Sequence, residues 1–222
     1  MMRNYSIIVL IRAKGCEAMK ITLIEKNKKN PNTYMVYLDD GSVFSIPEEV
    51  YLKQGFYEKE EISNEEIIYI KEQIIYTTVK QKAMRYLTLK YRSEKEVKQK
   101  LMRDAFDEDI IESAISELKS IGYINDLIFT QKYIYDRSKL KPKSKRMLKY
   151  ELLNKGVDES IIDSVLDSWE VDDMTVAIGL VKKKFGKYNL KDEKIYKKAF
   201  AFLRHRGFET NVIIDVLKQF TD

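Results

Sequence analysis

The chain has 222 residues but only one cysteine, Cys16, and one histidine, His205. A single cysteine excludes an intramolecular disulfide and a zinc site with four cysteine ligands, and it fits a reducing compartment. A histidine-based metal site or catalytic triad would have to use His205, which lies between two arginines without a nucleophile or orienting carboxylate pattern beside it. The sequence also has no G-x-x-x-x-G-K-[ST] phosphate loop and no acidic run with calcium-loop spacing. We therefore expect a protein that is not an enzyme and that uses no metal or cofactor.

Long apolar runs are absent as well. The longest one near the N-terminus covers residues 7–11, far short of the roughly 20 residues that a membrane span needs. It is also too brief for the core of a signal peptide, and Lys14 stands where a lipoprotein processing site before Cys16 would have a small residue. We expect a cytoplasmic protein without membrane contact. Met19 opens a strand pattern, so residues 1–18 are predicted to be a leader or the product of a misannotated start.

Proline is scarce, with three in the chain, and helical patterns dominate after residue 63. Before that point, residues 19–62 alternate apolar and polar side chains around the turn signal Asp39-Asp40-Gly41, which predicts a small antiparallel β meander. Ser63 and Ser93 each stand three residues before a glutamate, the spacing of a capping box at a helix N-terminus. We predict that a linking helix starts at Ser63 and runs on into the following region.

A repeat of 51 residues is the strongest internal signal, and it relates Phe106, Val157 and Phe208. Other apolar positions keep the same register without insertions: Leu101, Leu152 and Leu203; Ile110, Ile161 and Val212; Ile111, Ile162 and Ile213; Ile115, Leu166 and Leu217; Leu118, Trp169 and Phe220. Such stripes predict a packed core. The prediction is a mainly α protein of three tandem three-helix repeats in an elongated, curved array, after an N-terminal β meander and helix. We place the extension at residues 19–62, the linking helix with repeat 1 at 63–126, repeat 2 at 127–172 and repeat 3 at 173–222.

Charge alternates in sign within each repeat. Residues 80–103 carry nine basic and two acidic side chains, whereas 104–120 carry one and six. Residues 137–155 carry eight basic and one acidic side chain, whereas residues 156–173 carry no basic and seven acidic side chains. Residues 182–206 carry ten basic and two acidic side chains. If equivalent helices align, these clusters predict separate basic and acidic stripes, and a basic stripe could lie along DNA phosphates or an acidic protein groove.

Ten cations are predicted to form this basic surface: Lys90, Arg92, Lys98, Arg103, Lys139, Lys141, Lys143, Lys145, Arg146 and Lys149. Two alternatives remain open. The acids of first helical turns, such as Asp107 and Asp158, are also favoured by capping and the helix dipole. The alternating lysines around Pro142 could form a solvated linker.

Residues 83–220 resemble the RecX family in order, spacing and residue type. The matching segments are Tyr86-Leu87 with Arg92-Ser93-Glu94 and Lys100-Leu101; Phe106-Asp107 with Ile110-Ile111; Gly122-Tyr123-Ile124-Asn125-Asp126 with Phe129; residues 143–157; and Phe202-Leu203-Arg204 with Arg206-Gly207-Phe208. One departure is Lys141-Pro142-Lys143, where many members have Gly-Pro-Arg.

The resemblance implies a regulator of the recombinase RecA in DNA repair, homologous recombination and the SOS response. Such a protein would bind RecA and its filament on single-stranded DNA as a monomer, and would limit filament growth, ATP hydrolysis and strand exchange without catalysing a reaction. There are two alternatives: a nucleic-acid-binding protein that acts without RecA, and a scaffold for another acidic protein.

Overall fold

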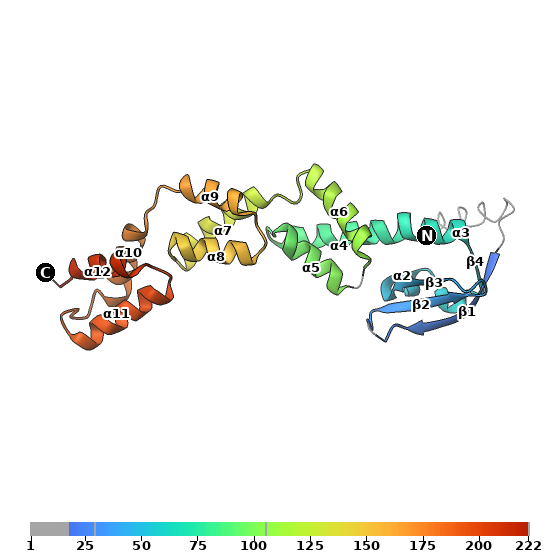
Figure 1. Cartoon of the computed structure of the whole chain (residues 1–222), viewed down its shortest axis with the longest axis horizontal. Helices are drawn as coiled ribbons and strands as arrows, with labels where there is room; N and C mark the ends of the chain where they lie inside the picture. Colours follow the sequence, from blue (N-terminus) through green and yellow to red (C-terminus); the bar gives the residue numbers. More distant parts are fainter. Residues whose placement is uncertain (1–17, 29, 105, 222) are drawn as a thin grey trace. The chain divides into compact units, whose positions relative to one another are not determined.

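The computed structural model describes residues 18–221 except 29 and 105 (Figure 1). They form two compact units: the described residues up to Lys90 together with Val97–Ile124, and Tyr91–Glu96 together with the described residues from Asn125 onward. The first unit contains a sheet and seven helices or parts of helices, and all regular elements of the second are helices. The predicted leader lies outside the described residues apart from Ala18, which begins the first strand.

The N-terminal extension is a four-stranded antiparallel sheet. Its strands follow the order β3-β2-β1-β4, with bounds β1 Ala18–Lys26, β2 Thr33–Leu38, β3 Val43–Pro47 and β4 Glu61–Ser63. The predicted meander is confirmed in β1 to β3. The short strand β4, which pairs with the start of β1, was not predicted, because three residues are too few to show a period.

Two short helices close one face of this sheet. Pro47 is the N-cap of α2 (Glu48–Lys53), and Gly55 with φ of 65° leads into the 3-10 helix η1 (Phe56–Glu58). Val36 and Ile46 of the sheet are fully buried in one core with Phe56. Burying these large apolar side chains supplies the main driving force for the extension to fold.

A long helical segment leaves the sheet, as predicted from Ser63. It consists of α3 (Asn64–Tyr69), the π-helix η2 (Ile70–Ile75) and α4 (Tyr76–Leu89) in direct succession. The Ser63 Oγ accepts a hydrogen bond from the N–H of Glu66 at 3.2 Å, which caps the segment. Ile75, Val79 and Ala83 are buried in the same core as the sheet, so the extension and repeat 1 share one core.

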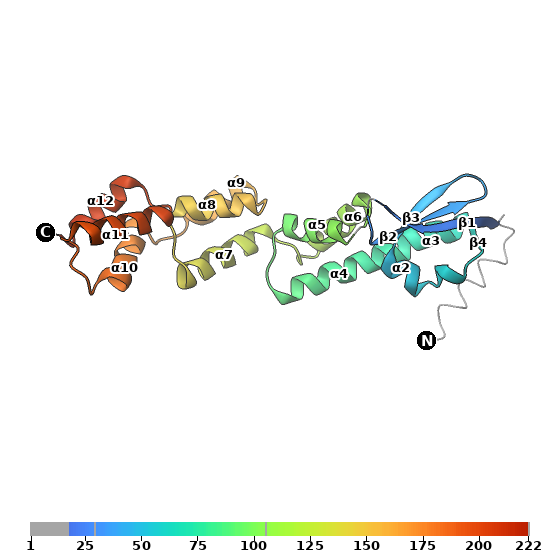
Figure 2. The same cartoon turned by 90° about the horizontal axis from the view of Figure 1, so that it is seen from below.

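Three helices form each repeat, at the places that the sequence predicted. Repeat 1 has α4, α5 (Glu94–Arg103) and α6 (Glu108–Ser120); repeat 2 has α7 (Asp126–Leu140), α8 (Lys145–Asn154) and α9 (Glu159–Asp167); repeat 3 has α10 (Asp173–Phe185), α11 (Glu193–His205) and α12 (Thr210–Lys218). In the second unit α7 and α8 pack on α9, and α10 and α11 pack on α12 (Figure 2).

The positions related by 51 residues lie in the core of each repeat. Phe106, Val157 and Phe208 are all buried. Ile111, Ile162 and Ile213 are completely inaccessible, and Leu101, Leu152 and Leu203 nearly so. The register positions thus carry the packing of each repeat, whereas the predicted domain limits and the predicted curved array stay predictions.

Helix ends are fixed by local chemistry. Gly122, Gly156 and Gly207 have φ between 79° and 89°, the left-handed conformation that ends a helix after its last turn. Ser93 and Glu96 form a reciprocal capping box, in which each side chain accepts from the other's backbone N–H at 3.2–3.3 Å. Within the described part of the chain, no helix is long and apolar enough to cross a membrane.

Candidate functional site

Two of the predicted cations pair with the acidic helix of their own repeat. The Nζ of Lys98 in α5 lies 2.8 Å from Glu108 and 2.7 Å from Glu112 of α6. Lys149 in α8 lies 2.7 Å from both Glu159 and Asp163 of α9. The lysine and both acids of the second set lie 51 residues after those of the first set, so the same ion-pair motif occurs twice. These carboxylates raise the pKa of both lysines by accepting their hydrogen bonds. Part of the predicted charge separation is therefore an attraction between adjacent helices.

Three further cations are used inside the second unit. Lys143 forms an ion pair with Glu151. The Lys145 Nζ donates to the carbonyl oxygens of Leu166 and Trp169, each at 2.9 Å, and thereby satisfies groups at the C-terminus of α9. Arg146 donates to the carbonyl of Gly207 from Nε at 3.4 Å and from Nη2 at 3.2 Å. The first two side chains stabilise repeat 2 and Arg146 joins it to repeat 3, which reduces their capacity to bind a partner.

The starts of α5 and α8 make the same kind of junction with the repeat that follows. The N–H of Glu94 donates to Asp126 at 2.9 Å, and the N–H of Lys145 donates to Asp173 at 2.8 Å. Each carboxylate satisfies a backbone donor that the helix itself leaves without a partner. Burial raises the pKa of Asp173, and the hydrogen bond from Lys145 only partly offsets it.

The five remaining predicted cations differ in exposure. Lys90, Arg103, Lys139 and Lys141 are exposed, and Arg92 is half-buried. The Nζ of Lys139 lies 5.7 Å from the centre of the exposed Tyr135 ring. Lys139 and Lys141 thus remain available to a partner in the second unit.

The sequence prediction missed the exposed cations of repeat 3. Eight cations of residues 182–206 are exposed and have no ion-pair partner among the described residues: Lys182, Lys183, Lys184, Lys187, Lys191, Lys194, Lys198 and Arg204. The signal was present, since residues 182–206 carry the largest basic excess of the three clusters. At the position equivalent to Lys149, repeat 3 has the half-buried Phe200, which packs on its core. The repeat therefore holds its helices together at this position by apolar contact.

A hollow of about 370 Å³ lies between α7 and α10 in the second unit. We call it the interrepeat pocket. Its lining includes three predicted cations, the exposed Lys183 and the only tryptophan of the chain: Tyr135, Ser138, Lys139, Pro142, Lys143, Lys145, Leu148, Trp169, Val171, Asp173, Thr175, Val176, Gly179, Leu180 and Lys183. It combines an apolar interior with cations, and its size falls within the range of ligand-binding pockets.

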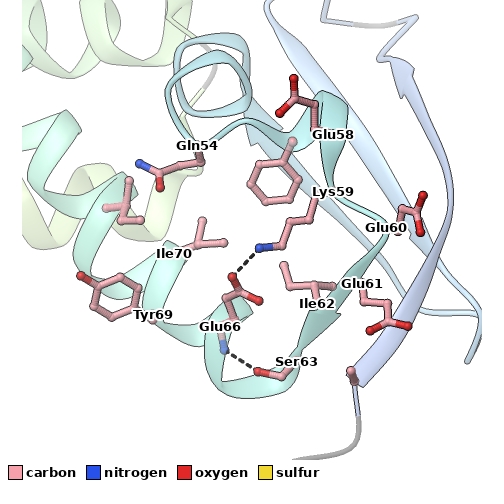
Figure 3. Close-up of a pocket in the computed structure, with 13 residues that line it drawn as sticks. Gln54, Glu58, Lys59, Glu60, Glu61, Ile62, Ser63, Glu66, Tyr69 and Ile70 are labelled. Atoms are coloured by element: carbon pink, nitrogen blue, oxygen red, sulfur yellow. Dashed lines mark hydrogen bonds and ion pairs between the residues drawn. The ribbon is translucent and has the colours of Figure 1, made fainter. Parts of the chain in front are cut away.

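A second hollow, of about 550 Å³, lies between the sheet and the α3 segment of the first unit (Figure 3). Its lining is acidic: Glu58, Glu60, Glu61 and Glu66 contribute carboxylates. Lys59 forms an ion pair with Glu66, and Ile62 and Ile70 supply apolar surface (Figure 3). The two hollows thus have opposite charge.

Among the described residues, no group of three or more His, Cys, Asp or Glu side chains is placed so that it could hold a metal ion. His205 is exposed at the end of α11.

Comparison with known proteins matches this architecture. Family models for the first, second and third three-helix domains of RecX match residues 80–118, 125–166 and 170–217. The regulatory protein RecX of Clostridium perfringens strain SM101 is 33% identical over 207 residues, which cover 91% of this chain and 97% of the relative. That of Clostridioides difficile strain 630 is 33% identical over 201 residues, with coverage of 90% and 94%.

Two solved structures share the fold. A crystal structure of regulatory protein RecX aligns with a TM-score of 0.60 at 24% identity and covers 90% of this chain and 99% of the other. The crystal structure of RecX from Lactobacillus salivarius aligns with a TM-score of 0.57 at 23% identity, with coverage of 66% and 96%. The three domains occur in order, and relatives a third identical match over nearly their whole length. This chain is therefore a member of the RecX family.

Proposed function

We propose that this protein regulates RecA in the cytoplasm by binding RecA and its filament on single-stranded DNA. It limits filament growth, and with it ATP hydrolysis and strand exchange. Family membership supports the RecA-regulating role, since the curated relatives are named regulatory proteins. The protein acts as a monomer and by occupancy: binding to sites on the filament shifts the balance between assembly and disassembly through linkage. No bond is made or broken.

The exposed cations of the second unit carry this proposal. Lys139, Lys141, Lys182, Lys183 and Lys187 have no ion-pair partner among the described residues and are exposed to solvent. A filament on DNA presents phosphates and acidic side chains, and exposed cations attract both. Of the ten cations predicted from the sequence, we assign partner contact first to Lys139 and Lys141, because several others have intramolecular roles.

The test is RecA ATP hydrolysis on single-stranded DNA with increasing amounts of the protein. The variant to compare is Lys182→Glu with Lys183→Glu and Lys187→Glu, which removes no intramolecular ion pair of the described residues. We expect the wild type to reduce hydrolysis below equimolar amounts and the variant to need at least tenfold more protein. The matched control is Lys20→Glu with Lys28→Glu and Lys71→Glu, an equal change in charge at exposed lysines of the first unit. It should behave like the wild type.

Reversing Lys143, Lys145, Arg146 and Lys149 together would be a poorer test, because that variant breaks four sets of internal contacts. An unchanged hydrolysis rate at every ratio would reject RecA regulation. Tight DNA binding by the protein alone, falling steeply with salt, would then favour a nucleic-acid-binding protein that acts without RecA. A scaffold role would show as capture of an acidic protein without nucleic acid.

A further inference from the structure

The interrepeat pocket has an apolar interior. Leu148 and Leu180 of its lining are buried, and Val171 of its lining is exposed. Val176 of α10 and Pro142 of the α7–α8 connection complete this surface. An apolar hollow that stays open on the surface of a folded protein is favourable only if something apolar can enter it.

Several polar groups of the pocket lining already have partners within the protein. The Ser138 Oγ donates to the Tyr135 carbonyl at 2.7 Å. Lys143 pairs with Glu151, Lys145 donates to two carbonyls, and Asp173 accepts from the Lys145 N–H. An apolar side chain needs no hydrogen-bond partner in this lining, whereas a buried nucleobase would need partners for each polar group of its edge.

Gly179 keeps one wall of the pocket open. It lies in the middle of α10, where glycine is the least favourable residue apart from proline. Its φ is not in the left-handed region, and a Cβ at this position would meet nothing within 4 Å. Neither backbone conformation nor packing thus explains the glycine. The glycine does leave the space above this stretch of helix backbone free for a close approach.

Two cations flank the opening. Lys183 lies one helical turn after Gly179, and Lys139 projects from α7 beside Tyr135. Both are exposed, and neither has an ion-pair partner in the part of the chain that the structure describes. An apolar group that enters this pocket therefore brings its neighbouring anions close to two available ammonium groups.

We propose that the interrepeat pocket binds an acidic peptide segment of a protein partner, with one large apolar side chain inserted beside Gly179 and flanking carboxylates on Lys139 and Lys183. The apolar interior selects the inserted side chain, and the two lysines select the acidic flanks. The proposal rests on the proposed function only in taking this segment to belong to the protein partner.

The probe is a labelled synthetic peptide with phenylalanine at its centre and three acidic residues on each side, titrated with the full chain. Binding is read by polarisation of the label and by fluorescence of Trp169, the only tryptophan and a lining residue. A peptide with serine at the centre is the comparison. We expect the phenylalanine peptide to bind at least tenfold more tightly and to shift Trp169 emission, because burial of one large apolar side chain gives about this factor.

Variants locate the site. Gly179→Leu fills the pocket with a better helix former, so the fold is kept and affinity falls at least tenfold. Lys139→Glu with Lys183→Glu should lower affinity to a similar degree and remove most of its salt dependence. The matched controls are Ala201→Leu on the exposed face of α11, and Lys20→Glu with Lys71→Glu, an equal change in charge at exposed lysines of the first unit; both should stay within twofold of the wild type.

Equal binding of the two peptides, or binding that Gly179→Leu leaves intact, would overturn the proposal. A Trp169 shift caused by oligothymidylate and lost in Gly179→Leu would also overturn it, in favour of a base-binding pocket. The titration contains no RecA, so it can fail while RecA regulation stands. Conversely, peptide binding with unchanged RecA hydrolysis would reject the proposed function and leave the pocket assignment in place.

Discussion

The first two repeats and the third share one core register but use their charges differently. In repeats 1 and 2, Lys98 and Lys149 form ion pairs with the following acidic helix. In repeat 3 the equivalent residue is Phe200, which packs on the core, and the lysines of α10 and α11 point to solvent. A cluster of cations in a sequence thus has two different meanings. In the first two repeats much of it stabilises the fold, whereas in the third most of it is available to a partner.

Two glycines at helix ends give the first test of how closely packed positions differ from positions in open space. Gly122 and Gly207 both end a helix with positive φ, but a Cβ would meet nothing at Gly122, whereas at Gly207 it would lie 2.6 Å from the Met147 Cβ and 2.7 Å from the Ser144 Oγ. We expect Gly207→Ala to cost about 2–5 kcal/mol, since it adds overpacking to backbone strain. Gly122→Ala should cost only the strain, about 1–2 kcal/mol. Urea unfolding followed by circular dichroism measures both, and equal losses would contradict the close contact at the junction of repeats 2 and 3.

Three lysines of α7 and α8 give the second comparison. Lys145 satisfies two carbonyls at the end of α9, so Lys145→Met should reduce the free energy of unfolding by about 1–3 kcal/mol. Lys149 pairs with exposed carboxylates, so Lys149→Met should have a smaller effect that disappears in high salt. Lys139→Met, at an exposed side chain, should stay within about 0.5 kcal/mol of the wild type. A larger effect for Lys149 than for Lys145 would reverse our ranking of their roles.

Two half-buried carboxylates of the second unit predict opposite and smaller pH effects. Burial raises the pKa of Asp173. Burial also acts to raise that of Glu151, but hydrogen bonds from Lys143 and Tyr133 outweigh it and hold this pKa below its usual range. Between about pH 3 and 6, around the ordinary carboxyl values, the stability of the wild type relative to Asp173→Asn should fall as pH rises. Relative to Glu151→Gln it should rise with pH, because the ionised carboxylate is the stabilising form.

Thermal unfolding of the three proteins across this range measures both slopes. Parallel slopes for the two variants would show that the environments of Asp173 and Glu151 do not differ as described.

Much of the fold could be predicted because it depends on local patterns. The 51-residue register located the three repeats, and Ser63 and Ser93 marked helix starts through chemistry that involves only neighbouring residues. Strand β4 and the π-helix η2 could not be predicted. The first is stabilised by pairing with β1, and the second interrupts a continuous helical pattern without a local signal.

The candidate site was less predictable. The sequence showed where cations are concentrated, but Lys98 and Lys139 look alike in it, and only the fold places one against two glutamates and the other beside a pocket. Gly179 has no sequence signal at all, since its meaning depends on the empty space above it.

The sequence by itself determined the repeat, the helix limits and the sign of charge in each segment, because these follow from spacing along one chain. Tertiary structure decided which cations are paired and where a pocket opens. Both depend on residues such as Lys149 and Asp163, or Lys139 and Gly179, that come together only when helices pack.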